Sequence, residues 1–244
     1  MHLVELSRQD HAHLRIDPAR MAEQAASCHM IPLVISEFRR AIADFPIMLA
    51  KNQETGRFSP YAVMGLAPGE NLFWDGAGLD SSYVPLNLGR LPFCIGIDED
   101  ETGAPRHAVC VDMESPMVDD AGPEGLVESD GRDSAYFGTI QKILQELLSW
   151  KPRTDRFIEV LAERDLIREL RLDIVLKSGA PLVITGLYAI DEDRFNRLSD
   201  ADIAELRRDG ILEPAYAMML STARIQSLID RRNRAEAKDG AWFQ

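Results

Sequence analysis

The spacing of apolar residues changes once along this chain, at about residue 135, and that change limits the folds it can adopt. Before it, short apolar runs alternate with polar residues and are separated by turn residues, a pattern typical of strands that bury one face. After it, apolar residues recur about every 3.6 positions, which indicates helices with one buried face. Strands followed by helices favour an α+β fold over a doubly wound parallel sheet.

Two pairs of strands are expected in the first half. Residues 45–50 and 58–66 are extended apolar runs, and the turn-forming residues 52–56 between them predict a hairpin. Residues 92–97 and 107–113 are two further runs of the same kind. Since short connections join neighbouring strands in antiparallel order, we predict an antiparallel meander.

The second half mixes helices with a hairpin. Apolar residues at helical spacing over 136–148 predict a helix that ends at Lys151–Pro152, because proline removes a backbone donor and clashes with the preceding turn. Thr154 can then cap a second helix. The alternating residues 171–176 and the run 181–190 predict a second hairpin.

Two more helices are predicted towards the C-terminus. Ser199 and Asp202 have the spacing of a capping box, and Gly210 is placed to end that helix in a left-handed conformation. The last helix is predicted to begin near Glu213–Pro214, since proline is tolerated in the first turn, and to run through Ile229.

The fold predicted from these elements is α+β, with a largely antiparallel sheet from the first half and C-terminal helices packed on it. At 244 residues and 45% apolar content, the chain is long enough for one large core. No internal repeat of useful length is evident. We therefore predict a single domain over residues 1–244, with the acidic loop 115–133 as the only candidate for an internal division.

Negative charge is concentrated in one part of the chain. Residues 98–133 contain 12 carboxylates against Arg106 and Arg132, a net charge of −10 out of −13 for the whole chain. This excess argues against a nucleic-acid partner, because such affinity comes mainly from cations that neutralise phosphates. The segment is expected to be a solvated loop, with a surface for cations or a basic partner as the alternative. Neither residues 98–101 nor residues 191–193 continue as a calcium-binding loop.

The chain is expected to be a cytoplasmic protein. No stretch approaches the roughly 20 apolar residues of a membrane helix. The N-terminal residues lack both a basic start and an apolar stretch long enough for a secretory signal, although export without a leader stays open. Cys28, Cys94 and Cys110 form an odd set without C-x-x-C spacing, so disulfides are not expected.

His11 and His13 form the only H-x-H pair, and they raise the question of a metal site. With His29 and either Glu37 or Asp17, they could provide the histidine and carboxylate ligands of iron or zinc. In cupin-like sites, however, the pair lies on a strand, whereas the residues that follow here resemble a helix start. We therefore predict exposed polar histidines, no metal ligands and no cofactor.

Glu37 and Glu70 are the carboxylates with the most unusual surroundings. Each stands next to apolar or aromatic residues, where burial can raise a carboxyl pKa enough for acid or base catalysis. The alternative is that they accept backbone hydrogen bonds or pair with Arg90. No G-x-S-x-G nucleophile motif occurs.

Several short motifs are spread in order from about residue 3 to residue 234. They are His29-Met30-Ile31-Pro32 with Glu37-Phe38, Phe45-Pro46-Ile47, Gly65-Leu66 with Gly69-Glu70-Asn71-Leu72-Phe73, Tyr83-Val84-Pro85-Leu86, Arg90-Leu91-Pro92-Phe93, and Gly186-Leu187-Tyr188-Ala189-Ile190-Asp191. The set resembles the SapC family of bacterial proteins, which is named for its association with surface-layer loci. The genes of relatives lie beside those of outer-membrane receptors, flavin-dependent halogenases and cupin-like hydroxylases. The resemblance implies a role around uptake or modification of a substrate, and it brings no catalytic residues with it.

Two hypotheses from different classes follow. We favour a non-catalytic accessory or binding protein for a surface-layer or outer-membrane uptake system, with an unknown small molecule or protein as partner and a homo-oligomer possible. Its predicted binding residues are His29, Glu37, Glu70, Asn71, Tyr83 and Arg90. The alternative is a metal-dependent, oxygenase-like enzyme that uses His11, His13 or His29. A surface-layer structural subunit is a third interpretation.

Overall fold

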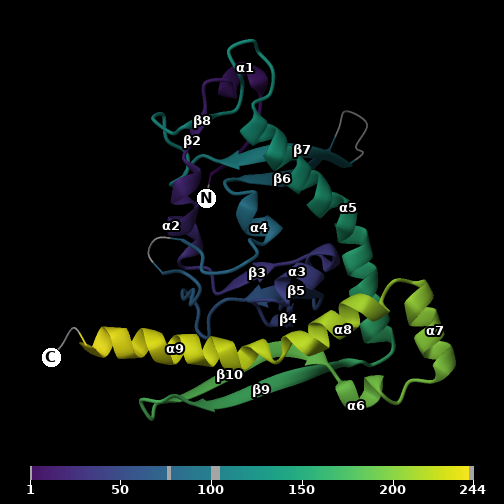
Figure 1. The fold of residues 1–244 in the computed structure, drawn as a ribbon. Coiled ribbons are helices and arrows are strands. Elements are labelled where there is room, and N and C mark those ends of the chain that lie inside the picture. Colours follow the sequence, from purple (N-terminus) through teal and green to yellow (C-terminus); the bar gives the residue numbers. More distant parts are fainter. Residues whose placement is uncertain (1, 76–77, 100–104, 242–244) are drawn as a thin grey trace. The chain divides into compact units, whose positions relative to one another are not determined.

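The computed structural model describes residues 2–75, 78–99 and 105–241, and it divides into two compact units (Figure 1). The first unit consists of Met1–Ala26 and Leu86–Ser149, and the second of Ser27–Pro85 and Trp150–Gln244. The three boundaries, at 26/27, 85/86 and 149/150, lie outside residues 115–133, which belong wholly to the first unit. A single domain over the whole chain therefore stays a prediction.

The described part of the first unit is built on antiparallel strands. A three-stranded sheet has the order β1-β7-β6, and a two-stranded sheet pairs β2 with β8. The strands are β1 (Leu3–Glu5), β2 (Arg15–Ile16), β6 (Phe93–Glu99), β7 (Pro105–Asp112) and β8 (Glu124–Gly125). Short helical segments accompany them: α1 (Arg8–His11), η1 (Pro18–Arg20), α2 (Met21–Ala25) and α4 (Leu86–Gly89). The predicted strands at 92–97 and 107–113 are thus confirmed as a hairpin.

The core of the first unit joins the sheet to the N-terminal half of α5 (Ala135–Glu163). Phe93 and Val111 are fully buried, and Phe137 packs tilted against Phe93 with 5.8 Å between ring centroids. Met117 and Leu126 from the acidic segment are buried in the same cluster. The expectation of a solvated loop is wrong for these positions, because their apolar side chains anchor the segment to the core.

Two of the three cysteines lie on neighbouring strands of the first unit. Cys94 and Cys110 lie on β6 and β7, directly opposite each other in the register. Both are half-buried thiols outside any disulfide among the described residues, as is Cys28. Burial raises the pKa of the Cys94 thiol above its ordinary value.

The second unit contains a five-stranded antiparallel sheet in the order β3-β5-β4-β10-β9. Its strands are β3 (Met30–Pro32), β4 (Ile47–Lys51), β5 (Phe58–Val63), β9 (Ile167–Val175) and β10 (Pro181–Ile190). The predicted hairpins are confirmed, β4 with β5 and β9 with β10. Pairing of β4 with β10, with Leu49 opposite Tyr188, joins them into one sheet. The predicted α+β class with antiparallel sheets is therefore confirmed, with strands from both halves of the chain.

Helices accompany this sheet in the second unit. They are η2 (Ile35–Glu37), α3 (Phe38–Ala41), α6 (Glu192–Phe195), α7 (Asp200–Arg208), α8 (Leu212–Ser221) and α9 (Arg224–Ala241). α8 contacts α3, α7, β4 and β10, and the hydroxyl of its buried Ser221 accepts the Ile47 N–H at 2.9 Å. α9 runs alongside the β9–β10 hairpin, where Asn233 accepts the Lys177 N–H at 2.7 Å (Figure 1). Among the described helices, none is long and apolar enough to cross a membrane.

α5 corrects the prediction of two separate helices. It runs unbroken from Ala135 to Glu163 with Pro152 inside it. Phe157 and Leu161 beyond the proline are fully buried, so packing of this half outweighs the roughly 3 kcal/mol that an interior proline costs. Thr154 is not an N-cap: its Oγ1 donates to the Trp150 carbonyl at 2.8 Å and accepts the Ile35 N–H at 3.1 Å.

The C-terminal helices agree with prediction at one end and differ at the other. Ser199 and Asp202 form the predicted capping box of α7, and Gly210 takes the left-handed conformation with φ +71°. The predicted single last helix is wrong, because the chain turns between α8 and α9 at Thr222–Ala223. Thr222 Oγ1 donates to the Met219 carbonyl at 2.7 Å there, a local bond that competes with the helical pattern.

Candidate functional site

Glu37 and Tyr83 are two predicted site residues that the structure brings together. Glu37 has no exposed surface. One carboxylate oxygen accepts the Val34 N–H at 2.8 Å, at the start of η2, and the other accepts the Tyr83 hydroxyl at 2.8 Å. The Arg40 guanidinium lies over the Tyr83 ring, 4.7 Å from its centroid. The pair thus connects the start of η2 to an arginine on the next helix.

His29, Glu70 and Asn71 meet around one tight loop that follows β5. The His29 carbonyl accepts the N–H groups of Met64 and Gly65 at 2.7 and 3.1 Å. A Cβ atom at Gly65 would collide with the Glu70 carbonyl oxygen, so only glycine fits there. The loop is therefore packed backbone against backbone.

The side chains of Glu70 and Asn71 close the same loop. Glu70 accepts the Leu66 N–H at 2.8 Å with one oxygen and pairs with Arg232 of α9 through the other. Buried Asn71 accepts the Phe73 N–H at 3.0 Å. These carboxylate and amide groups hold the fold of the loop, which is the alternative that the sequence left open for Glu70.

Arg90 belongs to the first unit. It donates to the Asn87 side chain at 2.8 Å and to the Phe93 carbonyl, just before and after the cis Leu91–Pro92 peptide bond. Burial lowers the pKa of its guanidinium below the ordinary value. Glu70 belongs to the second unit, where it pairs with Arg232.

The histidines proposed as metal ligands are divided between the units. His11 and His13 lie in the first unit, where His11 Nδ1 is 3.0 Å from the Ser7 nitrogen, and His29 lies in the second. Over the described ranges, no group of three or more His, Cys, Asp or Glu side chains is spaced to hold a metal ion.

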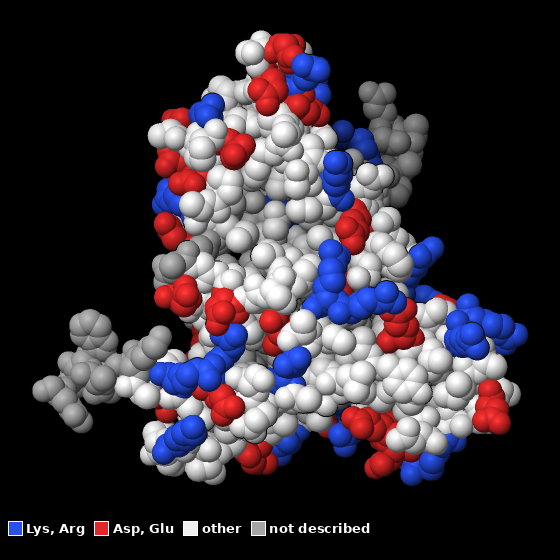
Figure 2. Space-filling view, viewed as in Figure 1, with Lys and Arg blue, Asp and Glu red and all other residues white. Residues whose placement is uncertain are grey.

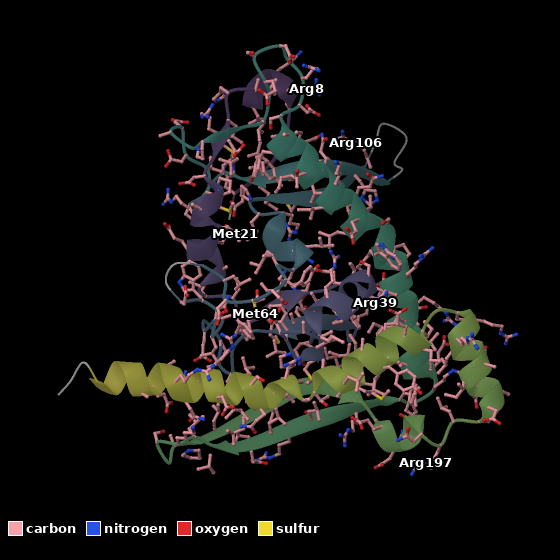
Figure 3. The ribbon with its side chains drawn as sticks, in the orientation of Figure 1. Arg8, Met21, Arg39, Met64, Arg106 and Arg197 are labelled. Atoms are coloured by element: carbon pink, nitrogen blue, oxygen red, sulfur yellow. The ribbon has the colours of Figure 1, made fainter. Side chains whose placement is uncertain are left out.

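A pocket of about 740 Å³ in the second unit has a different character, and we call it the arginine pocket. Of the described residues that line it, five are arginine and two are acidic. The lining residues are Ile35, Ser36, Phe38, Arg39, Arg40, Trp150, Arg153, Arg156, Arg208, Asp209, Gly210, Ile211, Glu213, Pro214 and Ala217. In the space-filling view, basic side chains gather on the face where the stick view labels Arg39 (Figures 2 and 3). The pocket is a local excess of positive charge on a chain of net charge −13.

Three helices supply the arginines. Arg39 and Arg40 lie on α3, and Arg208 is the last residue of α7. Arg153 and Arg156 follow Pro152 on α5, three residues apart and therefore on one face of the helix. This face exists because α5 continues through the proline.

The arginines differ in how their charge is used. Arg39 pairs with Glu213 at 2.5 Å, with both side chains largely exposed. Arg156 pairs with Glu163 at 3.3 Å, a contact that raises the pKa of its guanidinium. Arg153 lies over the Trp150 ring, 4.7 Å from the centroid. Among the described residues, neither Arg153 nor Arg208 has an ion-pair partner.

The arginine pocket can bind an anion, since guanidinium groups offer rigid pairs of N–H donors. None of the described residues that line it is His, Cys or Lys. The sequence analysis missed this site, because its arginines lie on helices far apart in the chain and single arginines carry no local pattern. None of the six predicted site residues lines it, although Arg40 connects it to Tyr83 and Glu37.

The fold defines this chain as an α+β protein with antiparallel sheets. Residues 6–228 match the SapC family, and the chain belongs to that family. No curated protein and no solved structure matches the chain.

Proposed function

We propose that this protein is a non-catalytic binding protein, accessory to a bacterial surface-layer or outer-membrane uptake system, and that the arginine pocket is its binding site. The observation that carries the proposal is the gathering of five arginines in one pocket of an acidic chain. Membership of the SapC family supports the surface-layer or uptake context.

The chemistry of the lining favours binding over catalysis. Acid–base or nucleophilic catalysis needs a titratable group within reach of a reacting atom, most often histidine, a free carboxylate, lysine or cysteine. The described lining offers only two such groups, the carboxylates of Asp209 and Glu213, and Glu213 is already paired with Arg39. Arginine stays protonated and provides charge and hydrogen bonds without exchanging protons.

The predicted residues Glu37 and Tyr83 fit this function as positioning residues. The Tyr83 ring stacks against the Arg40 guanidinium, and the Glu37 carboxylate accepts a hydrogen bond from the Tyr83 hydroxyl. Arg40 is thereby restrained before a ligand arrives, which lowers the entropy lost on binding.

Genetic complementation in the bacterial host tests the proposal. We expect deletion of the gene to reduce surface-layer retention or nutrient uptake, and the wild-type gene to restore it. A gene with Arg153→Gln and Arg208→Gln should fail to restore it. A gene with Arg197→Gln should succeed, because Arg197 is an exposed arginine in the α6–α7 loop, away from Arg39 (Figure 3). A deletion strain with normal surface layer and normal uptake contradicts the accessory role.

The non-catalytic part of the proposal has its own measurement. A ligand that co-purifies with the protein should be recovered with unchanged mass after prolonged incubation with fresh protein. Conversion of the ligand by wild-type protein, and not by the variant at Arg153 and Arg208, would identify an enzyme instead.

A further inference from the structure

We infer that the arginine pocket binds the phosphoryl or diphosphoryl group of a small organic ligand, whose uncharged part lies on the apolar lining. The inference rests on the proposed function, because it assigns a ligand class to the same pocket.

The first argument is the balance of charge within the pocket. The described lining holds five arginines and two carboxylates, and Glu163 outside it pairs with Arg156, so positive charge still exceeds negative charge in the pocket. Like charges held near each other repel, which raises the free energy of the protein. An anion with more than one negative charge relieves this repulsion, and the local positive field attracts it.

The second argument is that every cation in the described lining is an arginine, and that these arginines come from different helices. In the described lining every cation is arginine, whose planar fork binds two oxygens of a phosphate or carboxylate at once. The arginines come from α3, α5 and α7, and so approach the pocket from separate helices. A planar carboxylate offers two oxygens in one plane, whereas a phosphoryl group offers three oxygens in different directions. Convergence from several helices therefore favours the phosphoryl group.

The third argument is that one arginine of the pocket, Arg39, already binds a carboxylate of the protein, that of Glu213. The Nε and Nη2 atoms of Arg39 both donate to one oxygen of Glu213, at 2.8 and 2.5 Å. Arg153 and Arg208 have no ion-pair partner within the described ranges, so their charge is available to a ligand. Glu213 repels an incoming anion and competes with it for Arg39. Removal of the Glu213 charge should therefore raise the affinity for an anionic ligand.

The apolar lining indicates that the ligand is organic rather than a bare inorganic ion. Trp150 and Ile35 are half-buried apolar residues of the lining, and the Trp150 ring lies beside Arg153. A volume of about 740 Å³ lies within the roughly 300–1,000 Å³ usual for small-molecule sites. This space exceeds what one phosphoryl group fills.

Titration calorimetry on the full-length protein at low salt tests the inference. The ligands are inorganic pyrophosphate, adenosine monophosphate as an organic phosphate, and citrate as a carboxylate of similar charge. We expect saturable 1:1 binding of pyrophosphate and of adenosine monophosphate, and citrate to bind at least about tenfold more weakly than pyrophosphate. Added salt should weaken the binding.

Variants locate the binding. Arg153→Gln with Arg208→Gln should lower pyrophosphate affinity at least about tenfold, because charge-assisted hydrogen bonds are lost. The matched control Arg197→Gln changes charge elsewhere and should leave affinity within about twofold. Glu213→Gln removes no arginine and should raise the affinity. Thermal unfolding of each variant confirms that it is folded.

Three results overturn the inference: no saturable binding of either phosphate ligand, equal affinity in the wild type and the variant at Arg153 and Arg208, or tighter binding of citrate than of pyrophosphate. Failure here is distinct from failure of the proposed function. Without pyrophosphate binding, the host phenotype of the pocket variant would still support a binding protein for another ligand. Pyrophosphate binding at the pocket together with a normal deletion strain would reject only the accessory role.

Discussion

Two polar regions of the second unit show opposite uses of charged and polar side chains. In the first, Glu37 and Tyr83 are joined by a hydrogen bond of 2.8 Å, and Glu37 has no exposed surface. In the second, Arg153 and Arg208 are exposed on the arginine pocket, and neither has an ion-pair partner among the described residues. One region is closed by the chain itself, and the other is open to a ligand.

The difference follows from the cost of burial. A buried donor or acceptor left without a partner costs about 1–3 kcal/mol, so a folded chain satisfies such groups internally. An exposed arginine forms hydrogen bonds with water, so the absence of a protein partner costs the fold little free energy. Polar residues within apolar sequence therefore tend to become structural, and exposed arginines remain free to bind.

The largest expected effect is at Glu37. Glu37→Ala leaves the Val34 N–H and the Tyr83 hydroxyl without their acceptor inside the protein. We expect the free energy of unfolding to fall by roughly 3–5 kcal/mol in urea denaturation. Tyr83→Phe takes one donor from the buried Glu37 carboxylate and should cost about 1–3 kcal/mol, less than the loss of the carboxylate itself. Equal, small effects of both substitutions would show that Glu37 is not the structural acceptor described above.

Asn71 should give the next largest effect. Its side-chain oxygen accepts the buried Phe73 N–H at 3.0 Å, so Asn71→Ala should lower the free energy of unfolding by roughly 1–2 kcal/mol. Asn52 makes the same kind of turn, accepting the Glu54 N–H at 2.9 Å, but it is exposed. Water can replace its oxygen, and Asn52→Ala should cost less than about 0.5 kcal/mol. If Asn52→Ala lowers the free energy of unfolding as much as Asn71→Ala, the cost of losing the hydrogen bond does not depend on burial, and the contrast between buried and exposed polar groups fails.

Tyr136 refines this comparison, because its side chain is partly buried and its buried hydroxyl lacks a hydrogen-bond partner among the described residues. Tyr136→Phe removes this group and should raise the free energy of unfolding by up to about 1 kcal/mol. A clear loss of stability would show that the hydroxyl is bonded in solution.

The same residue predicts a pH dependence. Burial raises the pKa of Tyr136 from its ordinary value of 10.0 to about 12, because the charged phenolate is poorly solvated there. The unfolded chain ionises first, so the contribution is complete below pH 10 and is lost as the pH rises towards 12. Denaturation of wild type and Tyr136→Phe at intervals between pH 9 and 12 should show a steeper loss in the wild type. If the free energy of unfolding falls equally with pH in both proteins, the Tyr136 hydroxyl is not the group responsible for the pH dependence.

Local signals explain what the sequence predicted of the fold. Turn residues between apolar runs identified the β4–β5 and β9–β10 hairpins, and Ser199 with Asp202 identified the start of α7. Continuation of α5 through Pro152 depends on packing of Phe157 and Leu161 against distant residues, which no local pattern contains. The same applies to the pairing of β4 with β10.

The site was predictable only in its structural part. Glu37 and Tyr83 stood out because of their apolar and proline-rich surroundings, and those surroundings reflect burial. Arg153, Arg156 and Arg208 stand among other polar residues in helices with ordinary patterns. Their convergence arises from the arrangement of α3, α5 and α7, which sequence spacing does not contain.

The smallest effect on stability is expected at the arginine pocket. Arg153→Gln with Arg208→Gln removes two exposed charges without an ion-pair partner among the described residues, so the free energy of unfolding should change by less than about 0.5 kcal/mol. A slight gain is consistent with relief of repulsion between like charges. Arg39→Gln is the control, because it breaks an exposed ion pair with Glu213 and should cost up to about 1 kcal/mol. If the double variant loses more than about 1 kcal/mol, its arginines stabilise the fold, and the contrast between a closed structural pair and an open binding pocket fails.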